Sequence, residues 1–261
     1  MRLGAYQGPS VEGHVERALA TVERVLRAAA AFGSDVVVFP ELFTTGYALG
    51  QRLQALAEPA DGPTARALQD LAATAGVALV TGFCERSEQG LHNAALAIDR
   101  CGTSRGCYRK IQLFGDDEAS LFEAGDALPL VSLAGHRVGL LVCYDVEFAE
   151  WPRQLVDAGA EAILVPTAQM APFDHVARTL VRARALENAV PVVYANYCGR
   201  EAHLDYVGLS AIVGADGKDL ARAGPRGEAL LLADTAPPPA AEILSTQHRD
   251  RVTLCADDGS R

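Results

Sequence analysis

The sequence predicts a layered α/β domain with mixed sheets. Strand-like and helix-like segments alternate in the early and late parts of the chain, and hairpins fill the middle. No linker, repeat or low-complexity segment precedes residue 236. We therefore expect one domain over residues 1–235, followed by a Pro-rich, polar C-terminal tail over residues 236–261.

The first elements follow from periodicity. Residues 3–7 alternate as in a strand, and from Val15 the apolar residues recur at helical spacing until Gly33 ends the helix. Residues 35–39 form a short apolar run that is typical of a buried strand, and Pro40 ends it. This order indicates a β-α-β start.

The middle of the chain predicts a helix, a strand and a hairpin. The helix covers residues 64–75, and a strand over residues 77–82 follows it. Residues 93–99 and 106–111 flank a polar turn that contains glycine, as in a β-hairpin.

The later part of the chain alternates again between the two types of element. Residues 137–143 indicate a strand, and a helix over residues 152–158 has proline near its start. The remaining predicted elements are a strand at 162–165, a helix at 175–188 and strands at 191–196 and 208–213.

Composition excludes several classes of protein. The 261 residues carry a net charge of −10 and are 49% hydrophobic, which argues against disorder and against a nucleic-acid partner. No apolar run is long enough for a membrane span, and no signal peptide is evident, so we expect a cytoplasmic protein. The six cysteines and six histidines show no zinc, HExxH or Cys-x-x-Cys spacing, and we expect no metal and no cofactor.

Three reactive side chains follow predicted strands. Glu41 comes after residues 35–39, Lys110 lies near the end of the hairpin, and Cys143 ends a strand. Lys110 is one of only two lysines in the chain, the other being Lys218 in a polar turn, so its retention among arginines suggests a specific role. A carboxylate that accepts a thiol proton and an ammonium that stabilises an anion would together activate a cysteine nucleophile.

Each of the three residues has an ordinary alternative interpretation, as a loop carboxylate, a solvated lysine or a core cysteine. Other enzyme classes lack support. The segment GLSAI at 208–212 is not a GxSxG elbow, Cys143 has no neighbouring resolving cysteine, and no GxGxxG follows the first strand.

The contexts of these residues resemble the nitrilase superfamily of carbon–nitrogen hydrolases. The three main segments are VVVFPELFTTGY (36–47), YRKIQLF (108–114) and GLLVCYDVEFAEWPR (139–153). Further similar segments, in the same order, are EASLFEAGD (118–126), ARALEN (183–188), AN (195–196) and GLSAIVGADG (208–217). The resemblance covers roughly residues 1–235 and implies a four-layer α-β-β-α sandwich that pairs as a homodimer or larger homo-oligomer.

The resemblance also implies roles for individual residues. Cys143 would be the nucleophile, Glu41 the general base and Lys110 the group that stabilises the oxyanion, with the backbone N–H of Tyr144 as a second donor. Glu118 would help to position the substrate and the hydrolytic water. The reaction would pass through a thioester and release ammonia, without metal or cofactor.

Residues near the nucleophile favour one substrate class. True nitrilases typically have Trp-Glu after the cysteine, whereas this chain has Tyr144 and Asp145, as in amidase-like branches. ω-Amidases tend to have arginine shortly afterwards, where this chain has Val146 and Glu147. We therefore expect a small neutral amide as substrate. Candidate residues for the pocket wall are Tyr47, Phe148, Ala168, Gln169 and Met170.

Other activities on the same three residues stay open, namely nitrilase, N-carbamoyl-amine hydrolase and ω-amidase. An alternative of a different class is a non-catalytic member that binds metabolites. Such a protein would be expected to have lost one of the three residues, and all three are present.

Overall fold

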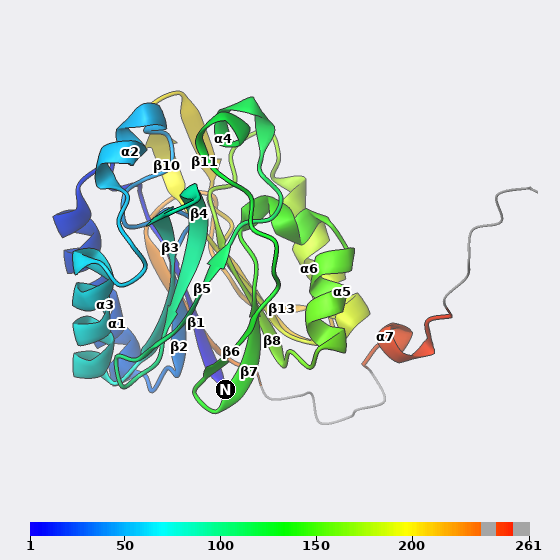
Figure 1. Cartoon of the computed structure of the whole chain (residues 1–261). Helices are drawn as coiled ribbons and strands as arrows, with labels where there is room; N and C mark the ends of the chain where they lie inside the picture. The colour runs from blue at the N-terminus through cyan, green and yellow to red at the C-terminus, as the bar shows by residue number, and fades with distance from the viewer. Residues whose placement is uncertain (236–243, 253–261) are drawn as a thin grey trace, which may run out of the picture.

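The computed structural model describes residues 1–235 and 244–252 and shows two β-sheets face to face between two layers of helices (Figure 1). The four-layer α-β-β-α sandwich is thereby confirmed. In the first sheet the strand order is β14-β1-β2-β3-β4-β5, with β1, β2 and β3 parallel. These strands are β1 (Arg2–Gln7), β2 (Val36–Val38), β3 (Ala78–Ser87), β4 (Gly90–Ile98), β5 (Ser104–Arg109) and β14 (Ala229–Asp234).

The second sheet has the order β13-β12-β9-β8-β7-β6, with β7, β8 and β9 parallel. Its strands are β6 (Leu130–Leu133), β7 (His136–Leu140), β8 (Ala162–Thr167), β9 (Val192–Asn196), β12 (Ala211–Val213) and β13 (Asp219–Arg222). Each sheet therefore has a parallel centre and antiparallel edges, as the mixture of crossovers and hairpins in the sequence predicts.

Helices cover the outer face of each sheet. The first sheet packs against α1 (Val15–Ala31) and α3 (Pro63–Ala75), and the second against α5 (Glu150–Asp157) and α6 (Val181–Asn188) (Figure 1). The remaining elements are η1 (Gly50–Arg52), α2 (Leu53–Leu56), α4 (Gly115–Leu121), η2 (Cys143–Glu147), the π turn η3 (Val176–Leu180), the hairpin β10 (Cys198–Glu201) and β11 (Leu204–Val207), and α7 (Gln247–Asp250).

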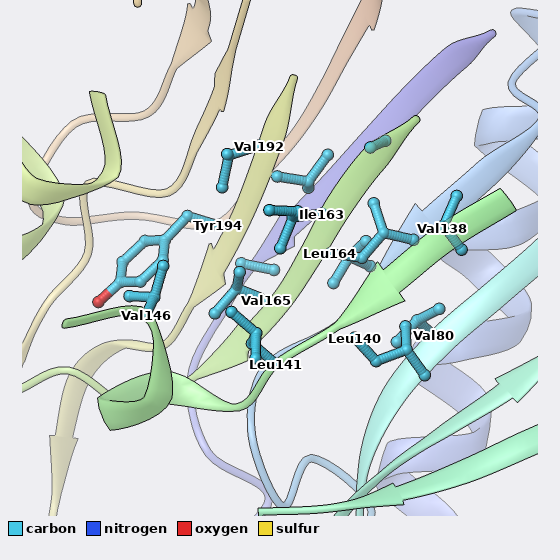
Figure 2. Packing of buried hydrophobic residues seen from close by; sticks show 14 of the residues in the cluster. Val80, Val138, Leu140, Leu141, Val146, Ile163, Leu164, Val165, Val192 and Tyr194 are labelled. Carbon is cyan, nitrogen blue, oxygen red and sulfur yellow. The ribbon is translucent and has the colours of Figure 1, made fainter. Parts of the chain in front are cut away.

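The period of two along the strands creates two separate cores. On β2, Val36 and Val38 face the second sheet, whereas Val37 packs on the side of α1 and α3. Figure 2 shows the contact between sheets, where Val80 of β3 lies beside Leu140 of β7. The fully apolar β2 is explained by burial on both faces.

Three predicted elements end differently in the structure. The strand predicted at 137–143 stops at Leu140, because the chain turns into η2 at Cys143. The strand predicted at 208–213 is reduced to β12, since Gly208 and Leu209 have φ of 62° and 60°. The helix predicted over 175–188 is divided into η3 and α6.

The strand predicted to end at Gly82 continues to Ser87. Gly82 lies in the middle of β3 because the chain at Glu41 and Leu42 crosses directly over it, and a Cβ on Gly82 would lie 2.0 Å from the Leu42 nitrogen. The glycine therefore allows a close backbone approach and does not end the strand.

Much of the predicted tail lies outside the described residues, including the Ala-Pro-Pro-Pro segment after Thr235. The division into a domain over 1–235 and a tail over 236–261 stays a prediction. Among the described residues, no helix is long and apolar enough to cross a membrane.

Candidate active site

Three ionisable side chains from the first sheet and its loops meet in one buried cluster. Glu41 follows β2, Lys110 follows β5 and Glu118 lies on α4. The Nζ of Lys110 donates to Oε1 of Glu41 and to Oε1 of Glu118, at 2.8 Å in each case, and Lys110 and Glu41 are fully buried. Two of the three ammonium donors are therefore committed to carboxylates, and the third, which has no acceptor among the described residues, can bind a developing anion.

Neighbouring backbone and side chains fix the position of Glu41. Its loop crosses Gly82 at short range, and Nδ2 of Asn93 donates to Glu41 Oε1 at 2.7 Å. The second oxygen, Oε2, is buried and has no donor among the described residues. Glu41 thus has one oxygen held by Lys110 and Asn93 and one oxygen available as a base.

Glu118 is bonded through both oxygens. Oε1 accepts from Lys110 and from the hydroxyl of Tyr47 at 2.6 Å, and Oε2 accepts from the backbone N–H of Phe114 at 2.9 Å. This set of bonds makes Glu118 a rigid anchor for Lys110 and Tyr47.

Cys143 comes from the second sheet, at the point where β7 turns into η2. Its φ of 47° is in the left-handed region, which is rare for a residue with a side chain and is typical of a strained functional turn. The thiol is buried and donates to Oε1 of Gln169 at 3.6 Å. Tyr144 lies in the first turn of η2, where backbone N–H groups have no partner within the helix, so its N–H can donate to an oxyanion.

Asp145 links the turn at Cys143 to the strand end at Lys110. Its Oδ2 accepts from the backbone N–H of Val142 at 2.9 Å and from the hydroxyl of Tyr108 at 2.8 Å. Its Oδ1 accepts from the backbone N–H of Gln112 at 2.8 Å. One buried carboxylate therefore holds together the segments on both sides of the cluster.

Two residues in the later segments support the same turn and its neighbouring loop. Arg184 on α6 donates to the carbonyl oxygens of Val146 and Glu147, at 2.9 and 2.6 Å. Asn196, at the end of β9, accepts from the backbone N–H of Gln169 at 2.8 Å. The sequence alone indicates no role for Asp145, Arg184 or Asn196, although all three lie in the segments that carry the resemblance.

Burial and charge set the protonation states in the cluster. Burial raises the pKa of the Cys143 thiol well above its usual value, and the Glu41 carboxylate raises it further against the opposing effect of Lys110. Burial also raises the pKa of Glu41. Burial alone would lower the pKa of Lys110, but the charges of Glu118 and Glu41 outweigh it, so the pKa lies well above its usual value. The resting thiol is therefore protonated, and its reaction requires a base.

A cavity of about 680 Å³ opens beside the cluster. Tyr47, Phe114, Glu118 and Met170 line it, together with apolar residues of the η1, α2 and α4 region. Its acidic lining also includes Asp116 and Asp117. The cavity is large enough for a small organic substrate.

The pocket residues predicted from the sequence occupy three different places. Tyr47 and Met170 line the cavity, while Gln169 contacts the Cys143 thiol and the backbone N–H of Ala168 also interacts with that thiol. Tyr144 and Phe148 belong to an aromatic row outside the cavity lining, with ring centroids 4.9 Å apart. Phe114 joins this row, 5.3 Å from Tyr144, and connects it to the cavity. No group of three or more potential metal ligands occurs among residues 1–235 and 244–252.

Comparisons with known proteins identify the class. Residues 2–242 match the carbon–nitrogen hydrolase family. The chain is 46% identical over 227 residues to a Pseudomonas protegens protein described as a hydrolase in the pqqF 5′ region, covering 86% of this chain and 79% of that protein. The crystal structure of an amidase from Nesterenkonia sp. superposes with a TM-score of 0.86 at 30% identity, covering 96% of this chain and 93% of that one.

A mutant of the amidase from Nesterenkonia sp. AN1 superposes with a TM-score of 0.83 at 32% identity, covering 90% of this chain and 89% of that one. In that structure the acetamide moiety of fluoroacetamide is covalently added at the active-site cysteine. The present chain belongs to the carbon–nitrogen hydrolase family, the nitrilase superfamily, and is an enzyme of its amidase-like branch. The family and enzyme class expected from the sequence are confirmed.

Proposed function

We propose that this protein hydrolyses the C–N bond of a small neutral carboxylic amide, giving the acid and ammonia through a thioester on Cys143. The observation that carries the proposal is the buried set of ion pairs among Glu41, Lys110 and Glu118. Two of these groups, Glu41 and Lys110, shift the pKa of the Cys143 thiol, in opposite directions. A buried base with a free oxygen, a fixed ammonium and a thiol are the groups that acyl transfer requires.

In the first half of the reaction, Oε2 of Glu41 accepts the proton of Cys143 as Sγ attacks the amide carbon. The carbonyl oxygen becomes an oxyanion, which the free donor of Lys110 and the N–H of Tyr144 stabilise. When the tetrahedral intermediate collapses, Glu41 returns the proton to the nitrogen and ammonia leaves.

In the second half, Glu41 takes a proton from water as the water oxygen attacks the thioester carbon. A second oxyanion forms in the same place and collapses with release of Sγ, which regains the proton from Glu41. The products are the carboxylic acid and the free thiol, and one base serves both halves.

The lining of the cavity supports a neutral substrate. None of its described lining residues is lysine or arginine, and three of them are the acidic Asp116, Asp117 and Glu118. A substrate carboxylate would find no lysine or arginine in this lining to pair with, and the three carboxylates would repel it. Fluoroacetamide, which reacted with the Nesterenkonia amidase mutant, is itself a neutral amide.

Ammonia release from a panel of compounds tests the proposal. The panel contains short aliphatic amides, amino-acid amides, N-carbamoyl compounds, ω-amides of oxo acids and matching nitriles. We expect release from neutral amides. Release only from nitriles, carbamoyl compounds or oxo-acid amides would show that the substrate belongs to that class of compound, and no release from any member of the panel would contradict the proposed substrate.

The variant Cys143→Ala tests the nucleophile in the same assay. It should abolish turnover while leaving the melting temperature nearly unchanged, because only a buried thiol is removed. Cys107→Ala is the matched control, since Cys107 is a half-buried thiol on β5 that the mechanism does not use, and it should remain active. Activity in Cys143→Ala comparable to that of the active control Cys107→Ala would exclude Cys143 as nucleophile.

Assembly as a homodimer or larger homo-oligomer stays a prediction that sedimentation can test.

A further inference from the structure

The β10–β11 hairpin carries a buried carboxylate that the proposed mechanism does not use. Glu201, at the end of β10, is only 2% exposed. Its Oε2 accepts from the hydroxyl of Tyr206 on β11 at 2.6 Å and from the backbone N–H of Tyr47 at 3.2 Å. Burying a carboxylate costs desolvation free energy, which the hydrogen bonds from Tyr206 and Tyr47 offset.

The bond to Tyr47 depends on a close approach between two segments far apart in the sequence. Gly46 has φ of 99°, and a Cβ at that position would lie 2.6 Å from Oε1 of Glu201. The chain at Gly46 and Tyr47 is therefore shaped to receive the Glu201 carboxylate.

From Tyr47, hydrogen bonds lead directly to the charged cluster. The Tyr47 hydroxyl donates to Oε1 of Glu118, which also accepts from Lys110. Because Glu201 holds the backbone of Tyr47, it fixes the position from which this hydroxyl reaches Glu118. Two residues, Tyr47 and Glu118, thus connect Glu201 to Lys110 through hydrogen bonds of 3.2, 2.6 and 2.8 Å.

The same hairpin also holds the loop beside the thiol. The backbone N–H of Val207 donates to the carbonyl of Gln169 at 3.0 Å, and the N–H of Ala171 donates to the carbonyl of Asp205 at 2.9 Å. Gln169 in turn accepts from the Cys143 thiol. One hairpin therefore contacts both halves of the site, the side of Lys110 through Glu201 and the side of Cys143 through β11.

The structure assigns Glu201 as a positioning residue, which acts through Tyr47 on Glu118 and Lys110 and makes the β10–β11 hairpin the element that aligns the two halves. This assignment rests on the proposed function for its consequences on turnover. It predicts that removal of the Glu201 acceptor affects catalysis only while the Tyr47 hydroxyl is present.

A double-mutant cycle tests this dependence. Glu201→Leu removes the acceptor at similar volume, Tyr47→Phe removes the hydroxyl, and the double variant carries both changes. We expect each single change to lower kcat on a neutral amide about tenfold, and the double variant to lose only about tenfold in total, because coupled residues are not additive. Additive losses, about a hundredfold in the double variant, would overturn the assignment.

A second readout separates this proposal from the proposed function. The same cycle is measured as the rate at which iodoacetamide alkylates Cys143, which needs no turnover. If the wild-type protein releases no ammonia from any amide, the proposed function fails, and a non-additive cycle in alkylation still supports the role of Glu201. Additive effects in alkylation overturn that role whatever the substrate is.

Two further variants guard against a purely structural effect. Glu201→Gln keeps an oxygen at the position of Oε2 and should retain nearly full kcat, so a loss as large as that in Glu201→Leu would contradict the assignment; this variant also serves if Glu201→Leu does not fold. Glu58→Leu is the matched control, since Glu58 likewise accepts from a backbone N–H and a hydroxyl, both of Thr64, at 2.8 Å. It should lower the melting temperature without a coupled effect on Tyr47→Phe, and a coupling equal to that of Glu201 would overturn the proposal.

Discussion

The two sheets contribute different kinds of group to the site. The first sheet and its loops supply the charges, Glu41, Lys110 and Glu118, which are bonded to one another within their own half. The second sheet supplies Cys143, whose position comes from a backbone turn with φ of 47° and from the loop at Gln169. The charged half is fixed by side-chain bonds, and the thiol half by the course of the backbone.

This difference explains how the protein can bury an ionic site in its resting state without a large loss of stability. Lys110 offsets the desolvation of two carboxylates, so the first half buries its charges as a hydrogen-bonded group. The second half buries a protonated thiol, which costs little. In the proposed mechanism the two halves react where they meet, and the hydrogen bond from Tyr108 to Asp145 is one of those that join them.

The largest effect should come from changing the centre of the charged half. Lys110→Arg should lower kcat/KM by about a thousandfold, nearly as much as Lys110→Ala, because a planar guanidinium cannot replace a compact ammonium with two partners at 2.8 Å. Steady-state assays of both variants, with melting curves to verify folding, measure this. An arginine variant with most of its activity would show that charge alone suffices.

A smaller loss is expected at the edge of the charged half. Glu118→Gln keeps the shape but weakens the bonds that orient Lys110 and Tyr47, and should lower kcat about 10- to 100-fold. Circular dichroism should show the native fold. Near-normal kinetics would reduce Glu118 to a structural residue and confine the charged half to Glu41 and Lys110.

The pH profile tests the base directly. In the proposed mechanism Glu41 must be ionised, so kcat/KM should rise with pH as Glu41 loses its proton, and burial raises the pKa of Glu41 and so places this limb above the usual carboxyl pKa. The hydrogen bond from Asn93 lowers the pKa of Glu41, so Asn93→Leu should move the acidic limb to higher pH. If the acidic limb of the kcat/KM profile were unchanged in Asn93→Leu, it would report the titration of a group other than Glu41.

The smallest effect should come from a bond between the halves. Tyr108→Phe removes the hydroxyl that donates to Asp145 and should lower the free energy of unfolding by about 1–3 kcal/mol, with only a few-fold loss of kcat. Chemical denaturation and steady-state kinetics measure the two quantities. A loss of kcat as large as that of Glu118→Gln would mean that alignment between the sheets, more than charge, limits turnover.

Much of the fold could be predicted because most strands and helices are indicated by the local spacing of their apolar residues. The valines of β2 and the apolar stripe of α1 depend on burial patterns that repeat over a few residues. The hairpin of β10 (Cys198–Glu201) and β11 (Leu204–Val207) was not predicted, although its pairing is local, because the residues of β10 are small or charged and do not alternate as in a half-buried strand. The segment of β14 was missed as well, because its partner is β1 at the other end of the chain.

The site divides in the same way. Glu41, Lys110 and Cys143 could be proposed because each follows a strand and lies in a segment that resembles the nitrilase superfamily. The structure brings Glu41 and Lys110 into direct contact. The sequence does not indicate a role for Glu201, because that role depends on the close approach of Gly46 to β10, and no local pattern predicts this contact. The strand that contains Gly82 was predicted too short for the same reason. The glycine is required by a close contact with the loop that carries Glu41, which is distant in sequence.

The pairing of β14 with β1 has a consequence for synthesis of the chain. Residues 229–234 form the strand beside residues 2–7, and the carboxylate of Asp234 pairs with Arg2. During translation, the edge of β1 that pairs with β14 therefore stays unpaired until more than two hundred further residues have been synthesised. A contact so distant in sequence closes late and slowly, and β1 presents an unprotected strand edge to other chains for most of that time. Nascent chains of this protein should depend on chaperones at the ribosome more than its compact final form would suggest.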